Sequence, residues 1–183
     1  MLVGLMGAGK STVGRVLADR WGCPFLDLDE EIERRAGTSV AEIFRCEGEE
    51  GFRRREAEAT RRLRPRPPLV IATGGGWMAR PELRDAWAGA IRVWLQVTPG
   101  EALDRLRGLP ATRPLLANES PGQVLETLLE RRSAAYRLAE IAVATSGHDV
   151  PETAAAVAEA VEDMANVAGR ADPAGRADPA DRP

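Results

Sequence analysis

Residues 4–11 read Gly-Leu-Met-Gly-Ala-Gly-Lys-Ser and match the P-loop pattern G-x-x-x-x-G-K-S at every defined position. The motif follows an apolar segment that predicts a strand, and it opens residues 11–21, whose apolar spacing predicts a helix. In such a loop the glycines let backbone N–H groups converge on phosphate oxygens, and the helix N-terminus adds a favourable dipole. The sequence therefore predicts a site for a nucleoside triphosphate.

Lys10 is the only lysine among the 25 basic residues, and all the others are arginine. A compact ammonium on a thin stem fits a narrow anion pocket better than a broad guanidinium fork does. We expect Lys10 to span the β- and γ-phosphates of the nucleotide and the Ser11 hydroxyl to ligate Mg²⁺. Because the guanine-binding motif of GTPases contains a second lysine, the sequence excludes that class.

At 183 residues, the chain has the length of one compact domain. A formal net charge of −3 argues against nucleic acid as a partner, and no apolar run approaches the roughly 20 residues of a membrane span. Two cysteines and one histidine are too few for a disulfide framework or for most histidine-ligated metal sites. The N-terminus lacks the pattern of a signal peptide, so we expect a cytoplasmic protein.

Short apolar segments alternate with amphipathic ones, which is typical of an α/β fold with a parallel sheet flanked by helices. Five strands are predicted, at Met1–Val3, Phe25–Asp29, Leu69–Thr73, Ile91–Val97 and Ile141–Thr145. Ser39, Thr98 and Ser120 each start a predicted helix; the third runs to about Glu140, and a last helix spans about Glu152 to Val167. The first strand is short, so either a few residues are missing before it or the strand is truncated.

Asp27 and Asp29 lie two residues apart at the end of the second predicted strand. Alternate strand residues face the same way, so both carboxylates can address one site. One carboxylate near the phosphates can hold Mg²⁺ through a water molecule, while the other reaches an acceptor hydroxyl. Equally, Asp29 can simply cap a helix that begins at Glu30.

Gly74, Gly75 and Gly76 follow the strand predicted at Leu69–Thr73, where a motor or helicase would usually carry an aspartate. Consecutive glycines allow a ligand to approach the backbone closely, although a tight turn explains one or two of them equally well. Arg113 lies in a segment of poor helix formers between two predicted helices, which is a suitable position for a mobile lid. An arginine on such a lid can close on the phosphates.

Together these motifs resemble the shikimate kinase family over nearly the whole chain, to about residue 168. The matching pieces are residues 4–12, Asp27-Leu-Asp29, Glu47-Gly-Glu-Glu-Gly-Phe-Arg53, Gly74-Gly-Gly76, Arg113-Pro-Leu-Leu116 and the segment from Arg132 to Tyr136. The P-loop occurs in many families, whereas this set in this order is far more specific. The resemblance implies a P-loop kinase with a lid and a nucleoside-monophosphate-kinase-like fold. It also implies transfer of the γ-phosphoryl group of ATP to the 3-hydroxyl of shikimate in the chorismate pathway.

The resemblance also implies which residues bind shikimate. Asp29 would bind the acceptor hydroxyls and act in catalysis with Lys10. Arg53 and Arg132 would bind the shikimate carboxylate, and the glycines at 74–76 would offer backbone groups to the substrate.

On the nucleotide side, the resemblance implies one Mg²⁺ ion per subunit, ligated by Ser11, with Asp27 near it through water. The enzyme would be a monomer whose partners are ATP and shikimate, without nucleic acid or membrane. The implied ATP-binding residues are Gly7, Ala8, Gly9, Lys10, Ser11, Thr12 and Arg113.

Near residues 144–151 the family usually carries an arginine that packs on the adenine; this chain has none there, and His148 is the only substitute that the segment offers.

Residues 169–183 repeat Gly-Arg-Ala-Asp-Pro-Ala, have almost nothing to bury, and are expected to form a disordered tail after a kinase domain of residues 1–168.

Two other classes remain open. A different small-molecule kinase, acting on gluconate or a nucleoside monophosphate, would share the P-loop and the lid. A non-catalytic homologue would bind nucleotide as a regulatory or interaction module, although complete phosphate-side and acceptor-side sets speak against it. Turnover with shikimate, compared with the other acceptors, discriminates among these classes.

Overall fold

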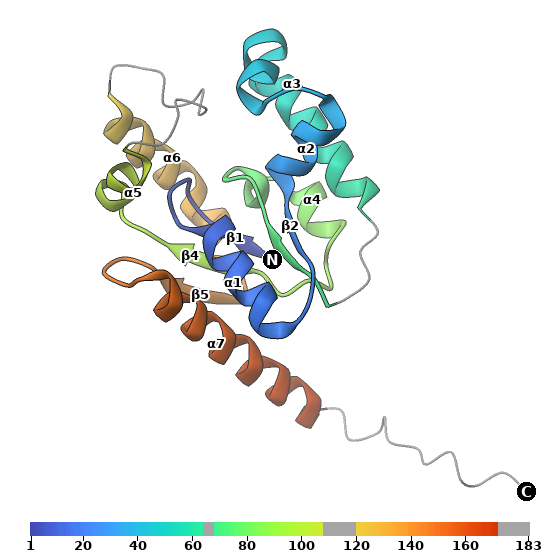
Figure 1. Cartoon of the computed structure of the whole chain (residues 1–183), viewed down its shortest axis with the longest axis vertical. Coiled ribbons are helices and arrows are strands. Elements are labelled where there is room, and N and C mark those ends of the chain that lie inside the picture. Colours follow the sequence, from blue (N-terminus) through green and yellow to red (C-terminus); the bar gives the residue numbers. More distant parts are fainter. Residues whose placement is uncertain (64–67, 108–119, 172–183) are drawn as a thin grey trace, which may run out of the picture.

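A parallel β-sheet forms the centre of the computed structural model, which describes residues 1–63, 68–107 and 120–171, with side chains to residue 167. All paired neighbours in the sheet are parallel. The five-stranded parallel sheet that the sequence predicts is therefore confirmed (Figure 1). The strands are β1 (Leu2–Val3), β2 (Phe25–Asp27), β3 (Val70–Ala72), β4 (Val93–Gln96) and β5 (Ile141–Ala144), in the order β2-β3-β1-β4-β5.

Helices connect the strands and flank the sheet. They are α1 (Lys10–Trp21), α2 (Leu28–Ala36), α3 (Val40–Arg62), the short 3-10 helix η1 (Trp77–Ala79), α4 (Pro81–Asp85), α5 (Pro99–Leu106), α6 (Pro121–Tyr136) and α7 (Val150–Ala171). All three predicted helix starts are confirmed, because α3, α5 and α6 begin directly after Ser39, Thr98 and Ser120. The side chains of Ser39 and Thr98 also cap their helices, since they accept hydrogen bonds from the N–H groups of Glu42 and Glu101.

The second strand differs from its prediction in a way that matters for the site. The sequence predicts a strand over Phe25–Asp29, but β2 ends at Asp27 and α2 begins at Leu28. The Asp27 carboxylate accepts a hydrogen bond from the N–H of Asp29, so Asp27 rather than Asp29 caps the helix. The two carboxylates therefore do not alternate along one strand, because the cap ends the strand before Asp29.

Two helix ends also differ from prediction. α6 was expected to reach about Glu140 but ends at Tyr136, because the N–H groups of Leu138 and Ala139 bind carbonyls only three residues back and close a turn. α7 begins at Val150 and runs to Ala171, beyond its predicted span at both ends. Residues 169–171, which the sequence assigns to a disordered tail, are therefore helical.

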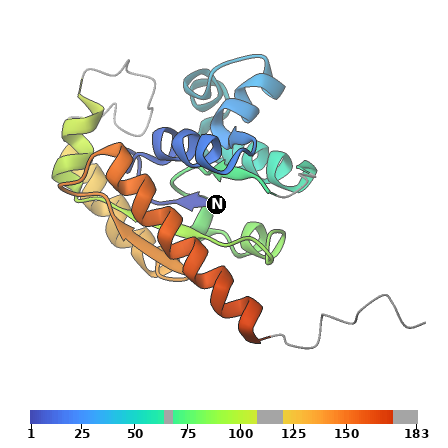
Figure 2. The ribbon, with the colours of Figure 1, turned by 60° about the horizontal axis from the view of Figure 1, so that its bottom comes forward.

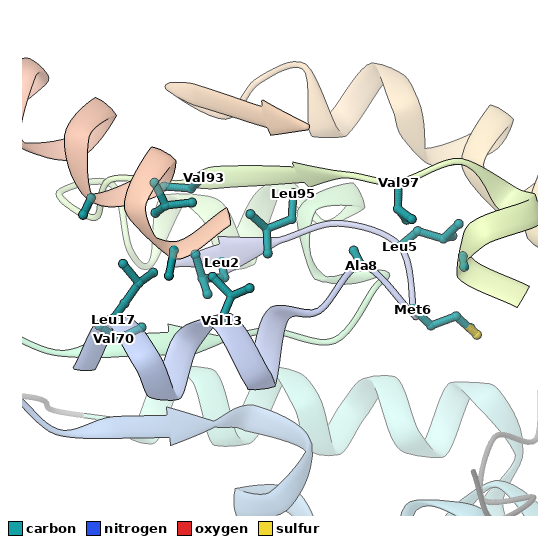
Figure 3. Close-up of a cluster of buried hydrophobic side chains, with 14 of the residues drawn as sticks. Leu2, Leu5, Met6, Ala8, Val13, Leu17, Val70, Val93, Leu95 and Val97 are labelled. Atoms are coloured by element: carbon teal, nitrogen blue, oxygen red, sulfur yellow. The ribbon is translucent and has the colours of Figure 1, made fainter. Parts of the chain in front are cut away.

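Successive residues of the strands point to opposite faces of the sheet and so build two cores. On one face, Leu2 and Leu95 pack with Val13 and Leu17 of α1 (Figure 3). Helix α7 runs beside α1 on this face (Figure 2). Val3 belongs to the second core, which it shares with buried residues of α2, α3 and η1.

The loops after the strands lie at the carboxyl-terminal edge of the sheet. The strand order sends the chain from β1 to β2 on one side and from β4 to β5 on the other, so these two connections diverge. Doubly wound sheets bind ligands in the crevice at such a switch point. The P-loop follows β1 at this point, so the strand order itself places residues 4–11 where a ligand can bind.

Some predictions fall on residues outside the described ranges. These are the lid around Arg113 and the part of the predicted tail beyond Ala171. Within the described part of the chain, no helix is both long enough and apolar enough to span a membrane.

The packing of α1 on the sheet gives a first prediction. A Cβ atom on buried Gly14 would lie 2.5 Å from Cε2 of Phe25 and 3.3 Å from Cδ1 of Leu2. Gly14→Ala should therefore lower the free energy of unfolding by about 1–3 kcal/mol, the usual cost of overpacking, despite the higher helix propensity of alanine. Urea denaturation followed by circular dichroism measures the change.

Gly100→Ala is the matched control, because Gly100 also lies in a helix but a Cβ atom there would meet nothing within 4 Å. This variant should keep the wild-type stability or exceed it by up to about 1 kcal/mol. If Gly14→Ala proved as stable as Gly100→Ala, the close contact of α1 with β1 and β2 would be wrong.

Candidate functional site

A cavity of about 830 Å³ opens at the carboxyl-terminal edge of the sheet. Its walls come from the P-loop and α1, the ends of β2 and β3, helices α2, α3, α5 and α6, and the segment between β5 and α7. Arg113 lies outside the described residues, but every other predicted site residue lines this cavity. They are Gly7, Ala8, Gly9, Lys10, Ser11, Thr12, Asp27, Asp29, Arg53, Gly74, Gly75, Gly76 and Arg132.

The P-loop presents the N-terminus of α1 to the cavity. Gly7 and Gly9 have φ angles of 81° and 88°, a left-handed conformation that glycine adopts without strain. α1 begins at Lys10, so the N–H groups of its first turn have no carbonyl within the helix to bind and can bind an anion. The Lys10 ammonium donates hydrogen bonds to the carbonyls of Gly4 (3.0 Å) and Leu5 (2.9 Å), which hold it on the same loop.

Ser11 and Asp27 meet beside the P-loop. The Ser11 hydroxyl donates a hydrogen bond of 2.5 Å to Oδ2 of Asp27, whose Oδ1 accepts the N–H of Asp29 at 3.0 Å. In the described residues, no three His, Cys, Asp or Glu side chains gather closely enough to hold a metal ion by themselves. Hydroxyl and carboxylate oxygens suit Mg²⁺, which commonly takes only one or two protein ligands and completes its shell with phosphates and water. The Ser11–Asp27 pair fits this kind of site.

Two arginine side chains lie in the space that a side chain on Gly75 or Gly76 would occupy. A Cβ atom on Gly76 would lie 2.6–2.7 Å from the guanidinium of Arg53, and one on Gly75 would lie 3.3 Å from Nη1 of Arg132. Neither glycine has a positive φ angle, so space rather than backbone conformation requires glycine here. The same Cβ on Gly75 would be 3.4 Å from the carbonyl oxygen of Gly4, which places the arginines next to the P-loop.

Gly74 makes room for two carboxylates in the same way. A Cβ atom there would lie 2.5 Å from Oε1 of Glu56 and 3.3 Å from Oδ1 of Asp29. Asp29 reaches this place from the first turn of α2, directly after the cap at Asp27. The three glycines were expected to give a ligand access to the backbone. The structure adds that they let charged side chains from α2, α3 and α6 converge.

Glu56 is a residue of this cluster that the sequence pattern did not indicate. Its side chain is fully buried, and its Oε2 accepts a hydrogen bond of 2.9 Å from Nη1 of Arg53. Its Oε1 has no hydrogen-bond partner among the described residues. Burial raises the pKa of this carboxyl group, while the charges of Arg53, Arg80 and Arg132 act in the opposite direction. The spacing of Arg53 and Glu56, three residues apart on one helix, was the available signal for the pair.

Arg132 enters the cluster from α6, and only 8% of its surface is exposed. One helical turn later, the hydroxyl of Tyr136 donates a hydrogen bond of 2.5 Å to the carbonyl oxygen of Gly75. α6 is therefore tied to the glycine segment both by the close approach of Arg132 and by this hydrogen bond.

Arg105 and the segment before α7 line one end of the cavity, where Nη1 of Arg105 lies 3.5 Å from the carbonyl oxygen of Gly7 in the P-loop. The Arg105 guanidinium donates hydrogen bonds to the carbonyl oxygen of Thr145 (2.6 Å) and to its hydroxyl (3.0 Å). His148 is exposed at the same end, and its Nδ1 lies 2.9 Å from the carbonyl oxygen of Ser146. The sequence pattern indicated His148 but not Arg105, because nothing local distinguishes Arg105 from the other arginines in the last turns of helices.

The cavity thus has two chemically different sides. The P-loop, Lys10 and the Ser11–Asp27 pair suit the phosphates and metal ion of a nucleotide. The partly buried cluster of Arg53, Arg132 and Asp29 suits a small acceptor with both an anionic group and a hydroxyl.

Comparisons of the sequence with known proteins agree on one family. A family model described as shikimate kinase matches residues 6–165. The shikimate kinase of Thermus thermophilus is 44% identical over 161 residues, which cover 86% of this chain and 86% of that protein. The shikimate kinase of Symbiobacterium thermophilum is 42% identical over 167 residues, which cover 89% of this chain and 95% of that protein.

Solved structures agree with the sequences. The shikimate kinase from Acinetobacter baumannii, determined in complex with shikimate, matches with a TM-score of 0.84 and 39% identity, covering 89% of this chain and 92% of that one. Identity at this level extends over most of both chains, and the fold agrees along the same length. On the grounds of sequence and structure together, the chain belongs to the shikimate kinase family.

Proposed function

We propose that the protein transfers the γ-phosphoryl group of ATP to the 3-hydroxyl of shikimate, giving shikimate 3-phosphate and ADP in chorismate and aromatic amino acid biosynthesis. The observation that carries the proposal is the meeting of Arg53, Arg132 and Asp29 around glycines that adjoin the P-loop. Shikimate is a small carboxylate with several hydroxyl groups, and arginine forks with one carboxylate acceptor suit such a molecule. The solved relative from Acinetobacter baumannii, which holds shikimate, supports the same acceptor.

On the acceptor side, Arg53 and Arg132 bind the shikimate carboxylate, and the glycine segment at 74–76 offers backbone groups to the ring. Asp29 faces the reacting hydroxyl. The bond from the shikimate oxygen to the γ-phosphorus forms as the bond to the β–γ bridging oxygen breaks, and ADP leaves with that electron pair. Because the transition state is loose, Asp29 mainly orients the hydroxyl and accepts its proton late.

On the nucleotide side, residues 7–12 provide backbone N–H groups to the phosphates, and the Lys10 ammonium spans the β- and γ-phosphates. Arg113, on the predicted lid, adds a further positive charge. The Ser11 hydroxyl would hold one Mg²⁺ ion per subunit, with Asp27 reaching the ion through water. When bound, Mg²⁺ supplies positive charge to the phosphate oxygens.

The proposal extends to the organisation of the whole chain. Residues 1–168 form the kinase domain. Residues 169–183, of which the first three still belong to α7, form a tail whose repeated Gly, Arg, Ala, Asp and Pro offer nothing apolar to bury. The resemblance to the family implies that the enzyme is a monomer. ATP as co-substrate supports a cytoplasmic enzyme, and the net charge of −3 supports a small-molecule acceptor rather than nucleic acid or a membrane surface.

A coupled ADP-release assay tests the acceptor directly. Shikimate should give rapid ADP release that depends on both ATP and Mg²⁺, whereas gluconate and nucleoside monophosphates should give far less. Faster release with gluconate or a nucleoside monophosphate would assign the site to a different small-molecule kinase. ATP binding without shikimate-dependent release would indicate a nucleotide-binding module.

The two aspartates should respond differently to substitution by asparagine. Asp27→Asn keeps a residue that caps helices well, so the variant should fold, need more Mg²⁺, and be partly rescued by excess metal. Asp29→Asn should lower kcat/KM for shikimate about 10²- to 10⁴-fold, the usual worth of a positioned base, with no rescue by metal. Steady-state kinetics over a Mg²⁺ titration measure both effects.

Calorimetry without shikimate provides the control, because ATP should bind Asp29→Asn as it binds the wild type. If excess Mg²⁺ rescued Asp29→Asn but not Asp27→Asn, the two roles would be reversed. Near-normal turnover of Asp29→Asn would remove that residue from the catalytic step.

A further inference from the structure

Tyr136 joins α6 to the glycine segment that follows β3. Its hydroxyl donates a hydrogen bond of 2.5 Å to the carbonyl oxygen of Gly75, and only 1% of the residue is exposed. The ring packs against Trp94 of β4, with 5.6 Å between ring centroids. A tyrosine in this place could serve the core alone, since a buried hydroxyl needs a partner. Its neighbours, however, belong to the acceptor side of the site.

The hydrogen bond determines the orientation of the peptide group between Gly75 and Gly76. A peptide group is planar and trans, so its C=O and N–H point in opposite directions. Holding the Gly75 carbonyl against Tyr136 therefore directs the Gly76 N–H away from the Tyr136 hydroxyl. No hydrogen bond among the described residues uses that N–H, and Gly76 lines the cavity. The N–H can therefore bind an oxygen of a ligand.

Arg132 precedes Tyr136 by one turn of α6 and lies on the same face of the helix. Its Nη1 would be 3.3 Å from a Cβ atom on Gly75, so the guanidinium and the glycine backbone are in contact. Burial raises the pKa of the Tyr136 hydroxyl, and the nearby charge of Arg132 acts in the opposite direction. Arg132, Tyr136 and Gly75 thus form one packed unit at the end of β3.

We propose that Tyr136 is a positioning residue for the acceptor: its hydroxyl holds the Gly75–Gly76 peptide so that the Gly76 N–H and the Arg132 guanidinium face the same bound molecule. The inference rests on the proposed function, in which that molecule is shikimate. Tyr136 itself does not line the cavity, so it acts through these two groups. Its loss should weaken acceptor binding and leave nucleotide binding unchanged.

Tyr136→Phe tests this, because it keeps the ring and its packing on Trp94 but removes the hydroxyl. The KM for shikimate should rise about 2- to 10-fold, the worth of one neutral hydrogen bond, while the KM for ATP stays within about twofold. Thr60→Val is the matched control. It removes another buried hydroxyl of the same region, which accepts a hydrogen bond from Nε1 of Trp77 at 3.2 Å and lies outside the cavity. This control should lower Tm without changing either KM.

A second measurement needs no substitution, because Tyr136 is the only tyrosine of the chain. Growth on 3-fluorotyrosine labels this ring alone and gives a single ¹⁹F resonance. The resonance should shift saturably with shikimate, at concentrations that match its KM, and far less with a non-hydrolysable ATP analogue.

The outcomes separate the inference from the proposed function. If Tyr136→Phe lowers Tm without raising the KM for shikimate, Tyr136 is a core residue only and the inference is overturned. Equal rises in the KM values for shikimate and ATP, or a ¹⁹F resonance that does not shift when shikimate is added, would overturn it as well. If the wild-type protein does not turn over shikimate, the proposed function fails first and the inference fails with it.

Discussion

Charged side chains occupy the space that three consecutive glycines leave at the end of β3, and the rest of the site depends on this arrangement. Arg53, Arg132, Asp29 and Glu56 all approach positions where the Cβ atoms of other residues would lie. Groups of opposite charge brought together in this way offset part of the cost of removing each from water. The arginines nevertheless keep N–H donors for a ligand. A side chain at any of the three positions would displace at least one charged group.

The fold brings this cluster to the P-loop through two connections. The Asp27 carboxylate binds the Ser11 hydroxyl on one side and the N–H of Asp29 on the other, so it links the phosphate side to the acceptor side. Gly75 supplies the second connection, because a Cβ atom there would lie 3.4 Å from the carbonyl oxygen of Gly4 in the P-loop, and Tyr136 of α6 binds the Gly75 carbonyl. Phosphoryl transfer requires little covalent chemistry from the protein and much precise positioning. Short, partly buried connections between the two binding sides meet this requirement.

Local patterns predict those parts of the molecule that lie within one segment. The P-loop needs only its own glycines and the helix after it, and the alternation of apolar segments indicates five strands, though not their order. The sequence predicts Asp27 and Asp29 as a pair on one strand. The strand assignment of Asp29 is wrong, because the Asp27 cap ends the strand before Asp29. Spacing predicts an ion pair of Arg53 with Glu56, and Tyr136 ends a segment that resembles the family. Neither pattern predicts what these two residues do in the site, since their burial and their contacts with Gly74 and Gly75 depend on segments far along the chain. The roles of the lid arginine and of the tail stay predictions.

The central claim is that the space at the glycines positions the arginines, and the KM for shikimate of Gly76→Ala tests it most directly. Gly76 has φ and ψ of −98° and −4°, which alanine adopts without strain, so the variant changes only the space beside Arg53. Gly89→Ala, where a Cβ would meet nothing within 4 Å, is the control. The account predicts that Gly76→Ala raises the KM for shikimate about 10- to 150-fold, the worth of a charge-assisted hydrogen bond, and leaves the KM for ATP unchanged. An unchanged KM for shikimate would contradict it.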